Sequence, residues 1–175
     1  SGQPAINSGT SFACPNMAGI ASCLWQAFPE VNNMKIIDVL KRSASQYATP
    51  DDRAGHGIPD AKKAFVILQK ELYTGQANFL ACKTELRFSL KTNSAMSIEV
   101  ERKYESDADY TLATTLQNSG AYGNHDFEFI DDLTGTTASL VQYRLKVNIA
   151  TDTSYYLDSM IVNYGYPCDV PLAND

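Results

Sequence analysis

The hydrophobic pattern of this chain changes its period near Tyr73–Gln76, and the change divides the 175 residues into two parts. Before it, apolar residues recur at every third or fourth position, which is the spacing of an amphipathic helix. After it, apolar and polar residues alternate along successive segments separated by turn-forming clusters, which is typical of half-buried strands. The pattern therefore predicts a helical domain at residues 1–75 and an all-β antiparallel sandwich at residues 76–175.

Three helices are predicted in the first part. The first covers Phe12–Phe28, where apolar residues surround most of the circumference, so we expect a buried central helix. The second begins after Asn32 or Asn33, since either side chain can cap it. The third follows Pro59, which suits the first turn of a helix, and runs to about Leu72.

Ser11 lies where the sequence passes from small residues into the first predicted helix, so it is expected in the first helical turn. Backbone N–H groups at a helix N-terminus have no partner within the helix, and the helix dipole is positive there. Both features favour an anion beside Ser11, as the oxyanion of an acyl-transfer reaction requires. The alternative is that Ser11 only caps the helix.

The run G-T-S-F-A-C-P at residues 9–15, followed by N-M-A-G, resembles the nucleophile motif of the subtilisin-like serine peptidases, G-T-S-x-A-x-P, with its small-residue helix. The supporting positions are Gly9, Thr10, Ala13 and Pro15. Asn16 departs from the pattern, because many members carry His there. The resemblance implies an α/β catalytic domain in which Ser11 is the nucleophile and its backbone N–H contributes to the oxyanion hole.

A second run, G-H-G-I-P at residues 55–59, resembles the turn that closes the same catalytic domain before its last helix. In this family the catalytic Asp and His precede the Ser in sequence. The resemblance therefore implies that the His, the Asp and the oxyanion Asn lie upstream of Ser1, and that the chain is a C-terminal fragment. We expect His56 to be structural and His125 to face solvent from a loop, so neither is the candidate base.

Six strands are predicted in the second part, at residues 86–90, 96–101, 110–116, 127–129, 141–149 and 156–164. The segments I-E-V-E-R at 98–102 and Y-R-L-K at 143–146 resemble the fibronectin type III-like modules of secreted bacterial proteins. Such modules often follow a catalytic domain. The resemblance implies that the second part is an accessory sandwich.

Cys82 and Cys168 flank the predicted strands, and we identify them as a candidate disulfide. A bridge closing so long a loop would contribute about 3–5 kcal/mol and would imply an oxidising compartment. In the topology of the resembled module, both cysteines would lie at the same pole of the sandwich. Cys14 and Cys23 are expected to be small, buried packing residues, unless Cys14 meets a partner outside this chain.

The composition limits the classes of partner. A net charge of −6 and a pI near 4.8 argue against nucleic acid, and no apolar run is long enough to span a bilayer. The acidic pairs Asp51–Asp52 and Asp131–Asp132 are expected to be turn residues, because a calcium site needs more oxygen ligands. We expect no cofactor or metal in this chain, although the resemblance allows calcium in the parent protein.

These patterns together predict a fragment of a secreted or cell-surface subtilisin-like serine endopeptidase. Its parent would hydrolyse proteins or peptides through an acyl-enzyme on Ser11. The chain alone would be inactive, and the missing N-terminal part of the catalytic domain would be its partner. Two alternatives stay open: the chain is a non-catalytic accessory or adhesion fragment, or its parent has an incomplete triad.

Overall fold

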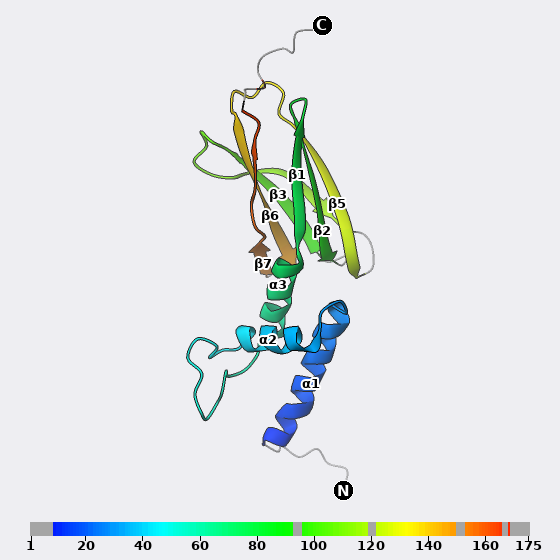
Figure 1. Cartoon of the computed structure of the whole chain (residues 1–175), viewed down its shortest axis with the longest axis vertical. Helices are drawn as coiled ribbons and strands as arrows, with labels where there is room; N and C mark the ends of the chain where they lie inside the picture. The colour runs from blue at the N-terminus through cyan, green and yellow to red at the C-terminus, as the bar shows by residue number, and fades with distance from the viewer. Residues whose placement is uncertain (1–8, 93–95, 119–121, 150–152, 166–167, 169–175) are drawn as a thin grey trace. The chain divides into compact units, whose positions relative to one another are not determined.

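A computed structural model describes residues 9–92, 96–118, 122–149, 153–165 and 168. The chain folds as two compact units, residues 1–68 and residues 69–175. Figure 1 shows the helices in the first part of the chain and the strands in the second. The fold class predicted from the sequence, a helical part followed by an all-β antiparallel sandwich, is confirmed.

The first unit is built from three helices. They are α1 at Thr10–Ala27, α2 at Asn33–Ser43 and α3 at Ala61–Leu72, the last of which ends beyond the unit. Asn32 is the cap of α2, because its side-chain oxygen accepts a hydrogen bond from the Lys35 N–H at 2.9 Å.

The core of the first unit lies where the C-terminal end of α1 meets α2 and α3. Phe28, Val39 and Leu68 have no exposed surface, and the rings of Phe28 and Phe65 lie 5.2 Å apart. The buried members of this cluster are Leu24, Phe28, Ile36, Val39, Leu40, Ala64 and Leu68.

The expectation that the first helix is buried is wrong for this structure. Leu24 is the only buried residue of α1, while Phe12 is 54% exposed and Trp25 is 44% exposed. The physical reason is the size of the unit: two short helices cannot surround an 18-residue helix that is apolar on most sides. Apolar surface of α1 therefore stays uncovered in the described part of the chain.

The loop between α2 and α3 is held by backbone hydrogen bonds across its base. The Ser45 N–H donates to the Ile58 carbonyl at 3.0 Å, and the Gln46 N–H donates to the His56 carbonyl at 2.9 Å. Gly57 has a φ of 81°, and a Cβ there would collide with the Ser45 hydroxyl. This turn therefore requires glycine at position 57.

The second unit is a sandwich of two antiparallel sheets. The first sheet has the order β1-β2-β5, with β1 at Thr74–Leu80, β2 at Lys83–Thr92 and β5 at Gly123–Asp132. The second sheet has the order β4-β3-β6-β7, and β8 also pairs with β6. Its strands are β3 at Met96–Tyr104, β4 at Thr111–Gln117, β6 at Leu140–Ile149, β7 at Thr153–Tyr156 and β8 at Met160–Asn163.

The described strands differ from the prediction in two respects. β1 was not expected, because its inward positions carry only Gly75, Ala77 and Phe79, a weak apolar pattern. The last predicted strand is split into β7 and β8, and Leu157 between them bonds through its N–H to the Leu145 carbonyl at 3.0 Å. Weak alternation therefore explains why β1 was not predicted, and the shortness of β7 and β8 explains why they were predicted as one strand.

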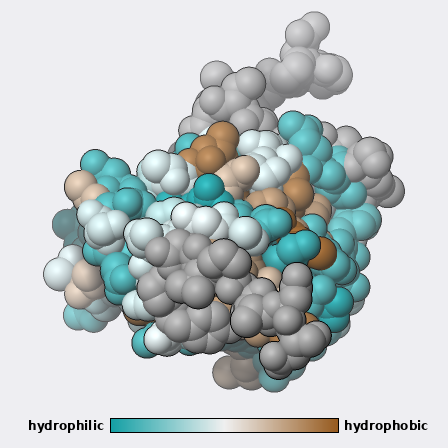
Figure 2. All heavy atoms as spheres, turned by 90° about the horizontal axis from the view of Figure 1, so that it is seen from above, coloured by the Kyte–Doolittle hydropathy of each residue, from teal (hydrophilic) through white to brown (hydrophobic). Residues whose placement is uncertain are grey.

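Alternation along the strands places the core between the sheets. The buried inward residues include Leu86, Phe88 and Leu90 of β2, Ile98 and Val100 of β3, and Val141, Tyr143, Leu145 and Val147 of β6. Exposed hydrophobic residues also occur, and on the face drawn in Figure 2 they form separate small patches between hydrophilic ones. In the described residues, no helix has the length and apolar character needed to cross a membrane.

A buried polar group joins the two sheets. Asp131 of β5 is 5% exposed and accepts hydrogen bonds from Arg102 of β3 at 2.5 Å and from the Tyr143 hydroxyl of β6 at 2.8 Å. Burial alone lowers the pKa of Arg102, but the hydrogen bond and charge of Asp131 outweigh it and raise that pKa. The carboxylate is therefore partnered from two strands of the opposite sheet.

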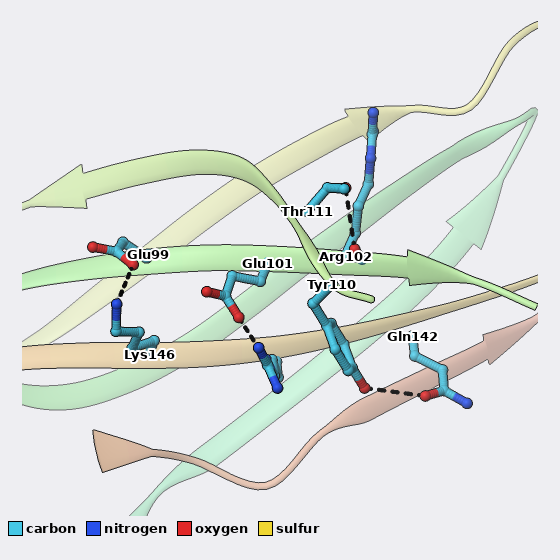
Figure 3. Close-up of polar contacts among 8 residues, drawn as sticks. Glu99, Glu101, Arg102, Tyr110, Thr111, Gln142 and Lys146 are labelled. Carbon is cyan, nitrogen blue, oxygen red and sulfur yellow. Dashed lines mark hydrogen bonds and ion pairs between the residues drawn. The ribbon is translucent and has the colours of Figure 1, made fainter. Parts of the chain in front are cut away.

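The outer face of the five-stranded sheet carries paired charges. The register places Glu99 opposite Lys146 and Glu101 opposite Arg144, and the two ion pairs measure 2.9 and 2.5 Å (Figure 3). The Arg144 guanidinium also lies 4.0 Å from the ring centre of Tyr110 and 4.4 Å from that of Tyr156. These contacts order the face, each contributing about 0.2–1 kcal/mol.

The inter-sheet contact of Tyr143 predicts a loss of stability when its hydroxyl is removed. Tyr143→Phe leaves the buried Asp131 with one hydrogen-bond donor fewer, so the free energy of unfolding should fall by about 1–3 kcal/mol in urea titrations. The control is Tyr110→Phe, which removes a hydroxyl bonded to Gln142 on the outer face and should cost about 0.5 kcal/mol. Equal costs for the two variants would contradict this role of Asp131.

The buried tyrosines predict a loss of stability at alkaline pH. Burial raises the pKa of Tyr73 to about 12, and it raises the pKa of Tyr143 and Tyr155 as well. In the unfolded chain a tyrosine loses its proton near pH 10. The raised pKa values therefore stabilise the fold below about pH 10, and this contribution is lost as the pH rises toward the folded pKa.

Unfolding titrations between pH 9 and 12 test this prediction. The free energy of unfolding should fall with pH above about 10, and the fall should be shallower in Tyr73→Phe than in the unmodified protein. Tyr156→Phe, in which an exposed ring of the same sandwich is changed, should leave the slope as it was. The prediction fails if Tyr73→Phe and Tyr156→Phe have the same slope.

Candidate active site

Ser11 is the second residue of α1, so it lies in the first helical turn. The cap of this helix is Gly9, and no side chain accepts a hydrogen bond at the cap. The alternative that Ser11 only caps the helix therefore does not describe this structure. Among the described residues, its hydroxyl makes no capping bond.

The backbone at Gly9 prepares the start of the helix. Its φ of 155° and ψ of 156° belong to a region that is essentially restricted to glycine. The Phe12 N–H donates to the Gly9 carbonyl at 3.1 Å, which closes the first turn. The N–H groups of Thr10 and Ser11 precede this bond and have no acceptor within the helix. They lie at the positive end of the helix dipole, where an anion is stabilised.

The surroundings of Ser11 are open. Side chains from Thr10 to Asn16 are exposed, and none of the hydrogen bonds in the described residues uses the Ser11 hydroxyl. Pro15 lies four residues later and has no N–H, so it cannot form the helical bond to the Ser11 carbonyl. Within the described part of the chain, the Ser11 side chain is therefore exposed to a reagent or substrate.

An apolar groove of about 630 Å³ runs beside α1 in the first unit. It is lined by Pro15, Asn16, Gly19, Ile20, Cys23, Leu24, Ala27, Ala61 and Phe65. A Cβ added at Gly19 would meet no atom within 4 Å. The small residues of α1 thus leave room for a further element, and none of the described residues fills it.

His56, the histidine of the first unit, forms no catalytic pair with Ser11, and the other histidine, His125, belongs to the sandwich. His56 lies in the loop before α3, its ring is 6.0 Å from that of Tyr47, and no hydrogen bond joins it to Ser11. His125 was expected in a solvent-facing loop, but it lies in β5 opposite Leu90 and is half-buried. The alternation of β5 turns His125 inward, which explains the difference.

The acidic pairs were expected in turns, and this is wrong for Asp131, which is a buried residue of β5 bonded to Arg102 and Tyr143. The Asp51 carboxylate accepts bonds from the N–H groups of Arg53 and Ala54, which lower its pKa. The Asp132 carboxylate accepts one from Thr134 at 3.0 Å. Within the described ranges, no three His, Cys, Asp or Glu residues lie together as a metal site would need. The Asp51 and Asp132 carboxylates are thus held by backbone N–H groups close to them in sequence.

Cys82 and Cys168 are joined by a disulfide, with their Cα atoms 5.7 Å apart and a sequence separation of 86 positions. Both are buried, at 8% and 3% exposure. Cys14 and Cys23, in contrast, are free and exposed, so the expectation that they are buried packing residues is wrong. Both lie on the uncovered part of α1, which accounts for their exposure.

Removing the disulfide should destabilise the sandwich. Changing both Cys82 and Cys168 to serine frees a long loop in the unfolded chain, so the free energy of unfolding should fall by about 3–5 kcal/mol in urea titrations. Changing the free Cys14 and Cys23 to serine is the matched control and should cost about 0.5 kcal/mol or less. A cost below 1 kcal/mol for the first pair would contradict the predicted contribution.

The chain thus combines a helical unit that presents an exposed serine at a helix N-terminus with an antiparallel β-sandwich. Residues 3–57 match the model of the subtilase family. The matched stretch includes Ser11 and the loop up to Gly57, and it supports a subtilase fragment and a serine peptidase as parent. Neither a curated protein nor a solved structure matches the chain.

Sequence reasoning missed three features around these sites. The groove beside α1 was not foreseen, although the small residues Gly19 and Cys23 indicate it. The Asp131 contact and the Arg144 stack depend on strand register, which alternation alone does not fix. The Asp131 contact could have been found from one signal in the sequence, an aspartate at an inward position of β5.

Proposed function

We propose that this chain is part of a subtilisin-like serine endopeptidase in which Ser11 is the nucleophile. The observation that carries the proposal is the position of Ser11: an exposed hydroxyl in the first turn of α1, behind a glycine cap, within the stretch that matches the subtilase family. A serine in that position combines a reachable nucleophile with unpaired backbone donors.

In the proposed reaction, the Ser11 hydroxyl oxygen attacks the carbonyl carbon of a peptide bond. The Ser11 N–H, at the positive end of α1, donates to the oxyanion that forms. A histidine takes the hydroxyl proton and later gives it to the leaving amine, and water then hydrolyses the acyl-enzyme. The substrate class is proteins or peptides.

The histidine, its orienting aspartate and an oxyanion asparagine are supplied by another segment of the catalytic domain. His56 is not bonded to Ser11, and it follows the serine in sequence, whereas the subtilisin order places the base before it. The groove beside α1 and the exposed rings of Phe12 and Trp25 provide apolar surface for that segment. Without it, the chain is inactive.

The sandwich is proposed to be a fibronectin type III-like accessory module of a secreted bacterial enzyme. Its antiparallel order, β1-β2-β5 against β4-β3-β6-β7, is that of a two-sheet sandwich with crossed connections, an architecture such modules share. The disulfide supports secretion, because disulfides persist in oxidising compartments.

Labelling with a fluorophosphonate probe tests the role of Ser11. In the natural protein that contains this chain, the probe should modify Ser11, as identified by peptide mass spectrometry. Ser11→Ala should abolish labelling and reduce peptidase activity by on the order of 10⁴-fold or more. Ser22→Ala changes another exposed serine of α1 and should leave both intact.

The same probe separates the alternatives when it is applied to residues 1–175 alone. Absence of labelling there, with labelling of the natural protein, supports a base supplied from elsewhere. Labelling of the short chain would instead make His56 the candidate base. A folded natural protein that is not labelled would contradict the peptidase proposal and favour a non-catalytic accessory role or an incomplete triad.

A further inference from the structure

The turn between β1 and β2 has an unusual backbone. Leu80 pairs with Lys83, so only Ala81 and Cys82 connect the two strands. Their φ angles are 49° and 60°, the only positive values among the described residues other than glycine. Two-residue hairpin turns of this hand normally carry Asn or Gly, because a Cβ disfavours the left-handed conformation. This turn therefore holds two residues in a conformation that neither favours.

Contacts from distant parts of the chain hold this turn. Cys82 is bonded to Cys168, and its carbonyl accepts a hydrogen bond from the Leu133 N–H at 2.8 Å. The Cys168 carbonyl accepts from the Gly135 N–H at 2.8 Å, and the Cys168 N–H donates to the Thr136 carbonyl at 2.9 Å. The disulfide thus ties the hairpin turn to Cys168, and the backbone of Cys168 is hydrogen-bonded to the loop that follows β5.

We propose that the Cys82–Cys168 disulfide is a redox-sensitive clamp that holds the β1–β2 turn in its left-handed conformation. When the disulfide is reduced, Ala81 and Cys82 leave that conformation and the Leu80–Lys83 end of the hairpin opens. The two sheets persist, because β2 and β5 pair over ten residues and β3 and β6 over nine. Reduction therefore loosens one end of the sandwich while its core stays folded.

The reductant is a dithiol, and the reaction is thiol–disulfide exchange. One thiolate of the dithiol attacks a sulfur of the bridge, forms a mixed disulfide and releases the other cysteine, which takes up a proton. The second thiolate of the dithiol then attacks the mixed disulfide and releases the remaining cysteine, which is also protonated. Two electrons pass to the two cysteines, and the dithiol becomes a cyclic disulfide.

The burial of the bridge adds a condition to this reaction. Cys82 is 8% exposed and Cys168 is 3% exposed, so a dithiol reaches the sulfur atoms only when this end of the sandwich opens locally. A substitution that lowers the conformational penalty of the closed turn stabilises the oxidised protein. It should therefore lower the equilibrium constant for reduction of the disulfide.

Ala81→Gly provides the test, because glycine adopts the left-handed conformation without the Cβ penalty. The protein is equilibrated with reduced and oxidised dithiothreitol, and the free thiols of Cys82 and Cys168 are counted by alkylation and peptide mass spectrometry. Relief of the penalty favours the oxidised form about 5- to 30-fold. The greater flexibility of glycine in the relaxed turn offsets part of this, so the equilibrium constant for reduction should fall about 3- to 10-fold.

The matched control is Ala108→Gly. Ala108 is an exposed alanine in the connection from β3 to β4 and is not among the residues with positive φ. This variant should leave the equilibrium constant for reduction unchanged. Equal constants for Ala81→Gly and the unmodified protein would overturn the proposal, because the turn would then keep its conformation after reduction.

Amide hydrogen exchange gives a second readout. In the reduced protein, protection of the Leu133 and Gly135 amides should fall at least 10-fold, since both donate to the carbonyls of the clamp. Protection of Val147 in the core of β6 should be retained. Unchanged protection at Leu133 and Gly135 would overturn the proposal, and so would loss of protection at Val147, which would mean that the sheets do not persist.

Discussion

The 18-residue helix α1 carries more apolar surface than the two helices beside it cover, and the candidate site depends on this imbalance. The C-terminal end of α1 is packed, with Leu24 buried in the core of the first unit. Its N-terminal end, with Phe12 and Ser11, extends away from that core. The same uncovered helix therefore explains the accessible serine, the groove at Gly19 and the two exposed cysteines.

The first turn of α1 supplies two of the elements that acyl transfer needs. The proposed nucleophilic oxygen and a backbone donor both belong to Ser11, so their relative geometry is fixed by the helix itself. The proposed base has no such local origin, because the histidine would reach the hydroxyl from another element. A site divided in this way gains activity only when the second element is in place, since the residues of a triad act as a unit. Coverage of the apolar groove and completion of the proposed triad would then be one event.

The sequence predicted the features that depend on neighbouring residues alone, such as helix starts and the inward faces of strands. Asn32 caps α2, Ser11 lies in a first turn, and the alternation of β2, β3 and β6 identifies their inward residues. Properties set by distant partners were not predictable in the same way. The exposure of Cys14 depends on what covers α1, and the inward position of His125 depends on its pairing with Leu90. The ion pair of Glu101 with Arg144 required the register of two strands that are far apart in sequence.

The sandwich concentrates its long-range constraints at one end. The register pairs Thr84 with Asp131 and Lys83 with Asp132, so a single row separates the buried carboxylate from the Ala81–Cys82 turn. Leu133, two residues after Asp131, donates a hydrogen bond to the Cys82 carbonyl, and the side chain of Cys82 forms the disulfide. The ionic contact of Asp131 and the Cys82–Cys168 disulfide thus hold neighbouring parts of the backbone. Because the carboxylate contact does not depend on redox state, it can keep the sheets together when the covalent one is broken, which is the condition that a local clamp requires.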